Sequence, residues 1–181
     1  QFRPGDEVFG TCNGSFAEYA CAREDKFVGK PADLTFEQAA AVPDSAVTAL
    51  EGLRDAGKVK SGQKVLIIGA AGGVGTFAVQ IAKAFGAEVT GVCSTTETDL
   101  VRSIGADHAI DYTREDFANR RQHYDVILDA AGNRSLSHLR RALSPQGTLV
   151  IIGGEGGGRW FGVGRQLLAL MLSPFVRQKL R

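Results

Sequence analysis

The 181-residue sequence predicts an α/β fold built on a doubly wound parallel sheet. Two observations lead to this prediction. Between Lys64 and Gly86 a continuous apolar run, a glycine-rich turn and a helical pattern follow one another without a break. Strands that are covered by helices on both faces show such apolar runs, and the alternation of strand and helix then repeats as far as Ile152.

The first unit of this pattern has the spacing of a dinucleotide-binding turn. The strand is predicted at Val65–Ile68, and the apolar residues after the turn recur at helical spacing. In the turn Gly69–Gly75, Ala70 takes the first place of the GxGxxG fingerprint. Gly72 takes the place where backbone meets the phosphates, and Gly75 the place where helix packs on strand. A pyrophosphate is therefore expected at the amino end of this helix.

The rest of the chain continues the alternation of a Rossmann fold. Strands are predicted at Glu88–Cys93, His108–Asp111, Tyr124–Ala130 and Gly147–Ile152, and helices at Asp99–Ile104, Arg114–Arg121, Ser135–Leu143 and Gly164–Leu172. With the first strand this gives about five of the six strands of a complete fold. The sixth is expected beyond the last residue, so an unpaired sheet edge is predicted to favour a homo-oligomer.

The first part of the chain predicts a different structure. Short strands are expected at Glu7–Phe9, Phe16–Cys21 and Phe27–Val28, with too few residues for an independent core. A capping box at Thr35 opens a short helix that Pro43 ends, and a second helix continues from Ser45 to Ala56. Residues 1–44 are therefore predicted to be the remnant of a β domain, and residues 45–181 the dinucleotide-binding domain.

Composition and charge exclude several kinds of partner. The net charge is +1 at pH 7, so no basic excess suggests nucleic acid, and the longest apolar stretch is too interrupted to span a membrane. No disulfide or metal-ligand spacing is present among Cys12, Cys21, Cys93, His108, His123 and His138. A reducing, cytoplasmic location and a small-molecule substrate are expected. Because the chain begins with Gln1, it is expected to be a piece of a longer protein.

The end of the second Rossmann strand, Ser94–Thr96, bears on the choice of cofactor. An acid about 20 residues after the last glycine binds the ribose hydroxyls of NAD, whereas hydroxyl groups can donate to the 2′-phosphate of NADP. NADP is favoured, although Glu97 lies close and no Arg or Lys stands at positions 94–100. The hydroxyls could equally cap the next helix. Asp129 could meet a ligand or cap the turn after its own strand.

Longer stretches of the sequence resemble a known family. The matching stretches are RPGDEVFG, GSFAEYA, KPADLTFEQAAAVPDSAVTALEGL, VLIIGAAGGVGTFAVQIAKAFGAEVTGVCS, SIGADHAIDY and GTLVIIGG. In order and spacing they resemble the medium-chain dehydrogenase/reductase superfamily, in its zinc-independent quinone oxidoreductase branch. The resemblance implies a GroES-like β-barrel domain, of which residues 1–44 are a remnant, and a Rossmann domain. It also implies NADPH-dependent reduction of quinones or activated alkenes.

The resemblance further implies the cofactor site. Gly72, Gly73, Val74 and Gly75 would hold the pyrophosphate, Thr48 would lie beside the nicotinamide, Ser94 and Tyr112 would approach the 2′-phosphate, and Gly153 and Gly154 would flank the nicotinamide ribose. It identifies no catalytic side chain. Relatives that use NADP carry a basic residue where this chain has Thr96 and Glu97, so NAD(H) stays possible. Zinc-dependent relatives carry a cysteine in the segment that is Val42–Ser45 here, so zinc is not expected.

Two other functions remain open beside hydride transfer from NAD(P)H to a quinone, an enone or another activated carbonyl. One is an NAD-dependent alcohol dehydrogenase, which a zinc-ligand segment upstream of Gln1 would favour. The other is a nucleotide-binding module without turnover, which a missing β-barrel and a missing sixth strand would favour.

Overall fold

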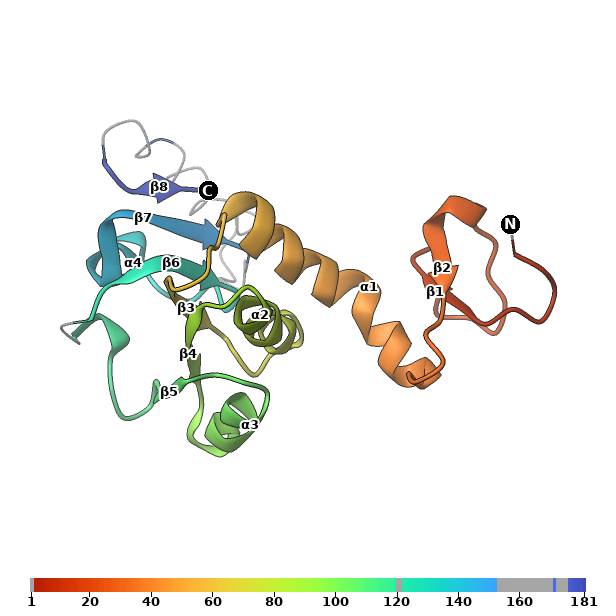
Figure 1. Cartoon of the computed structure of the whole chain (residues 1–181), viewed down its shortest axis with the longest axis horizontal. Helices are drawn as coiled ribbons and strands as arrows, with labels where there is room; N and C mark the ends of the chain where they lie inside the picture. The colour runs from red at the N-terminus through yellow and green to blue at the C-terminus, as the bar shows by residue number, and fades with distance from the viewer. Residues whose placement is uncertain (1, 120–121, 153–170, 172–175) are drawn as a thin grey trace. The chain divides into compact units, whose positions relative to one another are not determined.

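The structure is a computed structural model that describes residues 2–119, 122–152, 171 and 176–181. The chain divides into two compact units, Gln1–Val47 and Thr48–Arg181. Figure 1 colours it from red at the first residue to blue at the last. In the described ranges no helix is both long enough and apolar enough to cross a membrane.

The first unit contains a two-stranded antiparallel sheet. β1 (Val8–Gly10) pairs with β2 (Phe27–Gly29), and the 3-10 turn η1 (Glu24–Lys26) leads into β2. The strand predicted at Phe16–Cys21 is wrong, because those residues form no strand. A strand needs a neighbour for its N–H and C=O groups. Here Phe16 and Tyr19 are fully exposed rather than packed, at 107% and 90%.

A single helix replaces the two that were predicted between Thr35 and Ala56. The predicted capping box is present, with Thr35 N–H donating to Gln38 Oε1 at 2.9 Å and Gln38 N–H donating to Thr35 Oγ1 at 3.2 Å. α1 (Phe36–Leu50) then passes through Pro43 and continues as the π-helical turn η2 (Glu51–Ala56). The expectation that Pro43 ends a helix is wrong, because proline removes one N–H while the other turns keep their hydrogen bonds.

The second unit is built on a six-stranded parallel sheet. Its strands are β3 (Lys64–Ile68), β4 (Glu88–Cys93), β5 (His108–Asp111), β6 (Tyr124–Asp129), β7 (Leu143–Ile151) and β8 (Lys179–Leu180). Their order, β5-β4-β3-β6-β7-β8, is that of a Rossmann fold and can be followed in Figure 1. The predicted doubly wound sheet is confirmed. The prediction that the chain ends before its sixth strand is wrong, because Lys179–Leu180 pairs with β7.

Helices cover both faces of this sheet, and they are α2 (Gly73–Ala84), α3 (Thr98–Ser103) and α4 (Leu136–Ala142). α2 and α3 share one core cluster with Val65 and Ile67. α4 shares the other with Leu66 and Ile68. Each buried side chain of this size contributes about 1.5–3 kcal/mol. Successive residues of β3 thus face alternate cores, which explains why the whole strand is apolar.

Three further elements differ from the prediction or lie beyond it. In place of the helix predicted at Arg114–Arg121, the described residues form only the 3-10 turn η4 (Phe117–Asn119). Phe117 is buried there and packs edge-on against His138, with ring centroids 5.0 Å apart, which favours a turn over a polar surface helix. β7 begins at Leu143, before the predicted start at Gly147. The helix predicted at Gly164–Leu172 lies outside the described residues, apart from Met171.

Candidate functional site

The order of the strands reverses between β3 and β6, and a cavity of about 90 Å³ lies there at the carboxyl ends of the strands. Open parallel sheets bind their ligands at such reversal points. We call the cavity at this reversal point the carboxyl-end cavity. Its lining residues end or follow four strands, and they are Ile68, Gly69, Ala71, Gly72, Val92, Cys93, Glu97, Tyr112, Ala131, Asn133 and Arg134.

The glycine-rich turn is bonded to β4 as it leaves β3. Gly69 has a left-handed backbone with φ of 82°, and the N–H groups of Gly69 and Ala70 both donate to Val92 O, at 3.1 and 3.0 Å. A Cβ on Gly75 would lie only 2.0 Å from Gly69 O, so glycine is required for this close approach of α2. The sharp turn is therefore made by Gly69, one residue before the place that the fingerprint assigns to Ala70.

The first turn of α2 presents unused hydrogen-bond donors. Gly72 is the N-cap and provides no side-chain cap. The N–H groups of Gly73, Val74 and Gly75 donate to no acceptor within the described part of the chain. A helix begins with such free donors and with the positive end of its dipole. An anion placed here would therefore find several N–H groups and a favourable potential.

The segments that follow β4 and β5 leave the sheet side by side. Tyr112 N–H donates to Cys93 O at 3.1 Å, which places Tyr112 next to Ser94 at neighbouring strand ends. In the turn η3 (Thr95–Glu97), Glu97 Oε2 accepts from the Ser94 hydroxyl at 2.9 Å and from its N–H at 3.3 Å. Ser94 is the N-cap of η3 and forms a capping box with Glu97, so its alternative role as a helix cap is observed. Its predicted contact with a 2′-phosphate stays a prediction, and it would compete with Glu97.

Asp111 ties these two segments together. Its carboxylate accepts hydrogen bonds from the hydroxyls of Thr95 and Thr113 and from the Thr113 N–H. These bonds, that of Thr95 foremost, hold the pKa of Asp111 below its ordinary value. An ionised carboxylate therefore fixes the turn after β4 against the turn after β5.

Asn133 and Arg134, in the loop after β6, line the cavity although no role was predicted for them. Arg134 is half-buried, and its guanidinium forms no hydrogen bond or ion pair with the described residues. Asp129, the last residue of β6, was considered as a ligand contact or as a cap of the following turn. It is fully buried and accepts from Gly132 N–H at 3.0 Å, so it caps that turn. The strand order places the loop after β6 beside the turn after β3. Arg134 could therefore have been predicted as a site residue from the Rossmann strand order, in which these two strands are neighbours.

The structure brings together only part of the predicted site. Gly72 and Tyr112 line the cavity, and Gly73–Gly75 follow directly in α2. Thr48 is half-buried on α1 and is not a lining residue. Gly153 and Gly154 lie outside the described residues. Within the described ranges no three His, Cys, Asp or Glu side chains are grouped to hold a metal ion, and the expected independence of zinc stays a prediction.

Residues 73–171 match the family model of zinc-binding dehydrogenases, and they are more than half of the chain. The chain belongs to this family. Relatives of the chain are named as quinone and enone oxidoreductases, which confirms the resemblance to the medium-chain dehydrogenase/reductase superfamily.

Three relatives illustrate the match. The chain is 42% identical over 142 residues to a tomato (Solanum lycopersicum) 2-methylene-furan-3-one reductase and 41% identical to the mouse (Mus musculus) mitochondrial NAD(P)H oxidoreductase RTN4IP1. Each match covers 72% of this chain and 36% of the relative, so the chain spans about a third of their length. The quinone oxidoreductase of Coxiella burnetii has a similar structure, with a TM-score of 0.78 at 30% identity over 98% of this chain and 55% of that one.

Proposed function

We propose that this chain is the nucleotide-binding part of an NAD(P)H-dependent oxidoreductase that transfers hydride to a quinone, an enone or another activated carbonyl without zinc. One observation carries the proposal: the unused N–H groups of Gly73, Val74 and Gly75 stand beside the carboxyl-end cavity. The names of the tomato and mouse relatives support the same chemistry.

The residues of this chain bind and orient the cofactor in this proposal. The first turn of α2 holds the pyrophosphate, and family resemblance assigns Ser94 and Tyr112 to the 2′-phosphate. Thr48 and the Gly153–Gly154 pair are assigned to the nicotinamide end by family resemblance alone. When bound, the nicotinamide supplies the hydride. The role of the chain is therefore to hold the dinucleotide across the strand reversal, while no catalytic side chain is assigned to it.

NADP(H) is the cofactor that we favour, with NAD(H) as the second candidate. Arg134 supports NADP(H), because its guanidinium lines the cavity, is paired with no described residue and can bind a phosphate. Glu97 supports NAD(H), because a carboxylate at this place can accept from ribose hydroxyls and repels a 2′-phosphate. An NAD-dependent alcohol dehydrogenase therefore stays the alternative function.

A glycine substitution tests the pyrophosphate site with only a small adjustment of the fold. In Gly72→Ala the new Cβ would meet only Gly69 O, at 3.3 Å, and φ of −75° suits any residue. The methyl would nevertheless occupy space at the cavity, which Gly72 lines directly before the N–H groups of Gly73–Gly75. We expect the affinity for NADPH, measured by calorimetric titration, to fall about tenfold or more, because a lost charge-assisted hydrogen bond costs about 1.5–3 kcal/mol.

Gly29→Ala is the matched control, since a Cβ there would meet nothing within 4 Å. Its NADPH affinity should equal that of the unchanged chain. Wild-type affinity in a folded Gly72→Ala variant would contradict the proposed pyrophosphate site. Two assays of the longer protein separate the two candidate enzymes. The proposed oxidoreductase should oxidise NADPH with a simple quinone, whereas an alcohol dehydrogenase should oxidise an alcohol with NAD.

A further inference from the structure

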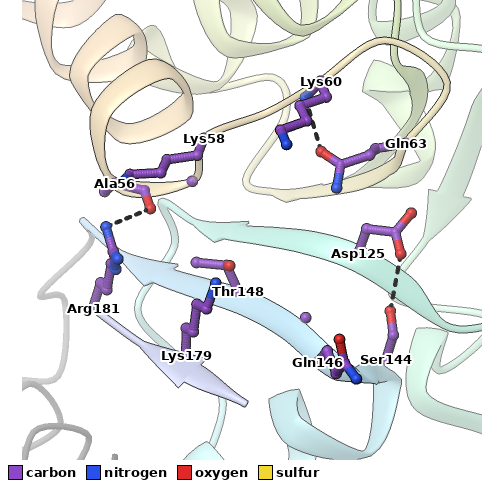
Figure 2. Close-up of a pocket in the computed structure, with 12 residues that line it drawn as sticks. Ala56, Lys58, Lys60, Gln63, Asp125, Ser144, Gln146, Thr148, Lys179 and Arg181 are labelled. Atoms are coloured by element: carbon purple, nitrogen blue, oxygen red, sulfur yellow. Dashed lines mark hydrogen bonds between the residues drawn. The ribbon is translucent and has the colours of Figure 1, made fainter. Parts of the chain in front are cut away.

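A second concave site lies at the opposite, amino end of the sheet. Figure 2 shows this groove, whose volume is about 360 Å³. Its walls come from the loop before β3, the starts of β6 and β7, and the segment of β8. We call it the amino-end groove, and the lining residues that matter here are Lys58, Lys60, Asp125, Thr148, Lys179 and Arg181.

The groove carries an excess of positive charge. Among the described side chains that line it, Asp125 alone is acidic, and both of its oxygens are engaged, Oδ2 by Lys64 N–H at 2.9 Å and Oδ1 by the Ser144 hydroxyl at 3.2 Å. The ammonium groups of Lys58, Lys60 and Lys179 form no hydrogen bond or ion pair with described residues. No described residue thus compensates these three cations, in a chain whose net charge is only +1.

The fourth cation, Arg181, has a structural role. Its Nη1 donates to Ala56 O at 3.2 Å and to Asp55 O at 3.5 Å, which satisfies carbonyl groups at the end of η2. Figure 2 shows Lys60 and Lys179 on opposite walls of the groove, with their ammonium ends directed into it. The lysines are therefore the groups that are free to meet a ligand.

Lys58 occupies a position that favours glycine. Its φ is 51°, the one left-handed backbone among the described non-glycine residues. Val59 N–H donates to Leu53 O at 3.0 Å, so Lys58 stands at the residue after a helix end where glycine is the usual choice. A lysine there costs stability relative to glycine. Lys58 therefore does not increase the stability of the fold relative to glycine, but it adds a positive charge to the groove.

We propose that the amino-end groove binds a multiply charged phosphate group of a small ligand. Lysine ammonium groups are compact donors that suit phosphate, and three of them match more than one negative charge. Neutral donors complete the wall: Thr148 has a hydroxyl, and Gln63 uses Oε1 to accept from Lys60 N–H at 2.8 Å, which leaves its NH₂ group to donate. The site is separate from the α2 turn and does not depend on the proposed function.

Amide NMR of the 15N-labelled 181-residue chain tests the proposal with inorganic phosphate and inorganic pyrophosphate as probes. At low ionic strength we expect saturable shifts of the Gly57 and Gly62 amides, stronger for pyrophosphate. Amides of Gly73 and Gly75 report binding at the α2 turn separately, so the two sites are not confused. Added salt should weaken the shifts, because exposed charges are screened.

Three variants decide whether the lysines are responsible. Lys58→Gly should weaken pyrophosphate binding about two- to fivefold without lowering the melting temperature, and Lys60→Gln with Lys179→Gln should weaken it further. Lys26→Gln removes an exposed lysine of the first unit and should leave binding unchanged. The absence of saturable groove shifts, or an equal loss of binding in Lys26→Gln, would overturn the proposal.

Discussion

The two ends of the parallel sheet differ in how they could recognise an anion. At the carboxyl end, the cavity is small, about 90 Å³, and the donors that no described residue uses are the main-chain N–H groups at the start of α2 and the guanidinium of Arg134. At the amino end, the groove is larger, about 360 Å³, and its free donors are exposed lysine side chains. The first site is fixed by backbone packing and the second by charge, so the two should fail for different reasons.

The difference has a physical basis. Main-chain donors are held in place by the helix, and a misplaced methyl group displaces a ligand from all of them together. Lysine side chains lose rotamer freedom when they bind and are screened by salt, so each contributes little by itself. One substitution should lower the affinity about tenfold or more at the carboxyl end, whereas several are needed for a comparable loss at the amino end.

The largest effect is expected for Gly75→Ala. The new Cβ would lie 2.0 Å from Gly69 O and 2.8 Å from Ala70 C, both main-chain atoms that cannot yield easily. We expect a loss of about 3 kcal/mol or more in the free energy of unfolding, measured with urea, because overpacking forces the backbone apart. Gly72→Ala is the control and should lose far less. Equal stability of the two variants would mean that Gly75 does not set the helix-to-strand distance.

A smaller effect, on cofactor choice, is expected for Glu97→Gln. Glutamine can still accept from Ser94, so the turn keeps its geometry while the charge disappears. The ratio of NADPH to NADH affinity should rise about fivefold, corresponding to about 1 kcal/mol of relieved repulsion near the surface. Calorimetric titration with both cofactors measures it.

Arg134→Gln should have the opposite effect and lower the ratio of NADPH to NADH affinity, because it removes a positive charge that can pair with the 2′-phosphate. Arg141→Gln is its control, because Arg141 is exposed and does not line the cavity. If Glu97→Gln and Arg134→Gln both leave the ratio as it was, neither side chain senses the 2′-phosphate.

The smallest effect is expected for Asp111→Asn, and it should depend on pH. The pKa of Asp111 is lowered in the folded chain, so its ionised form stabilises the fold above the ordinary value of about 3.9. That stabilisation disappears as the pH falls through the lowered pKa. The variant should therefore be less stable than the parent at neutral pH, and the gap should close in acid. Urea titrations at several pH values measure the difference in the free energy of unfolding between parent and variant. A difference that stays constant with pH would contradict the prediction and assign the effect to packing.

The fold could be predicted where local pattern and burial agree. Val65–Ile68 and the glycine-rich turn are recognisable because both faces of β3 are buried, which leaves a continuous apolar run. The sixth strand escaped prediction because Lys179–Leu180 is too short and too polar to show a pattern, and only its pairing with β7 defines it. Phe16–Cys21 failed for the opposite reason, since its alternation finds no partner strand among the described residues.

From the spacing of residues alone, the candidate site could be predicted only where it lies within one segment, whereas Tyr112 was indicated by family resemblance. Gly72–Gly75 belong to one turn, so their spacing reveals them. Arg134 lies far along the chain and reaches the cavity only because β6 pairs with β3. The hydrogen bond between Ser94 and Glu97 joins residues that are close in sequence. It could not be predicted with certainty, because it forms only when Ser94 is the N-cap of η3. Residues that are brought together by strand order thus remain hidden from sequence pattern.

The carbonyl oxygen of Val92 accepts from both Gly69 and Ala70, and its strand continues directly into the segment that contains Glu97. In the proposed mode of binding, this one peptide group of β4 joins the turn that would hold the phosphates to the strand that leads to the segment for the adenosine ribose. We expect changes after β4 to alter which dinucleotide is preferred and to leave intact the capacity to bind one. In this way the fold allows cofactor preference to evolve by exchange of a few exposed side chains, without renewed selection for the turn.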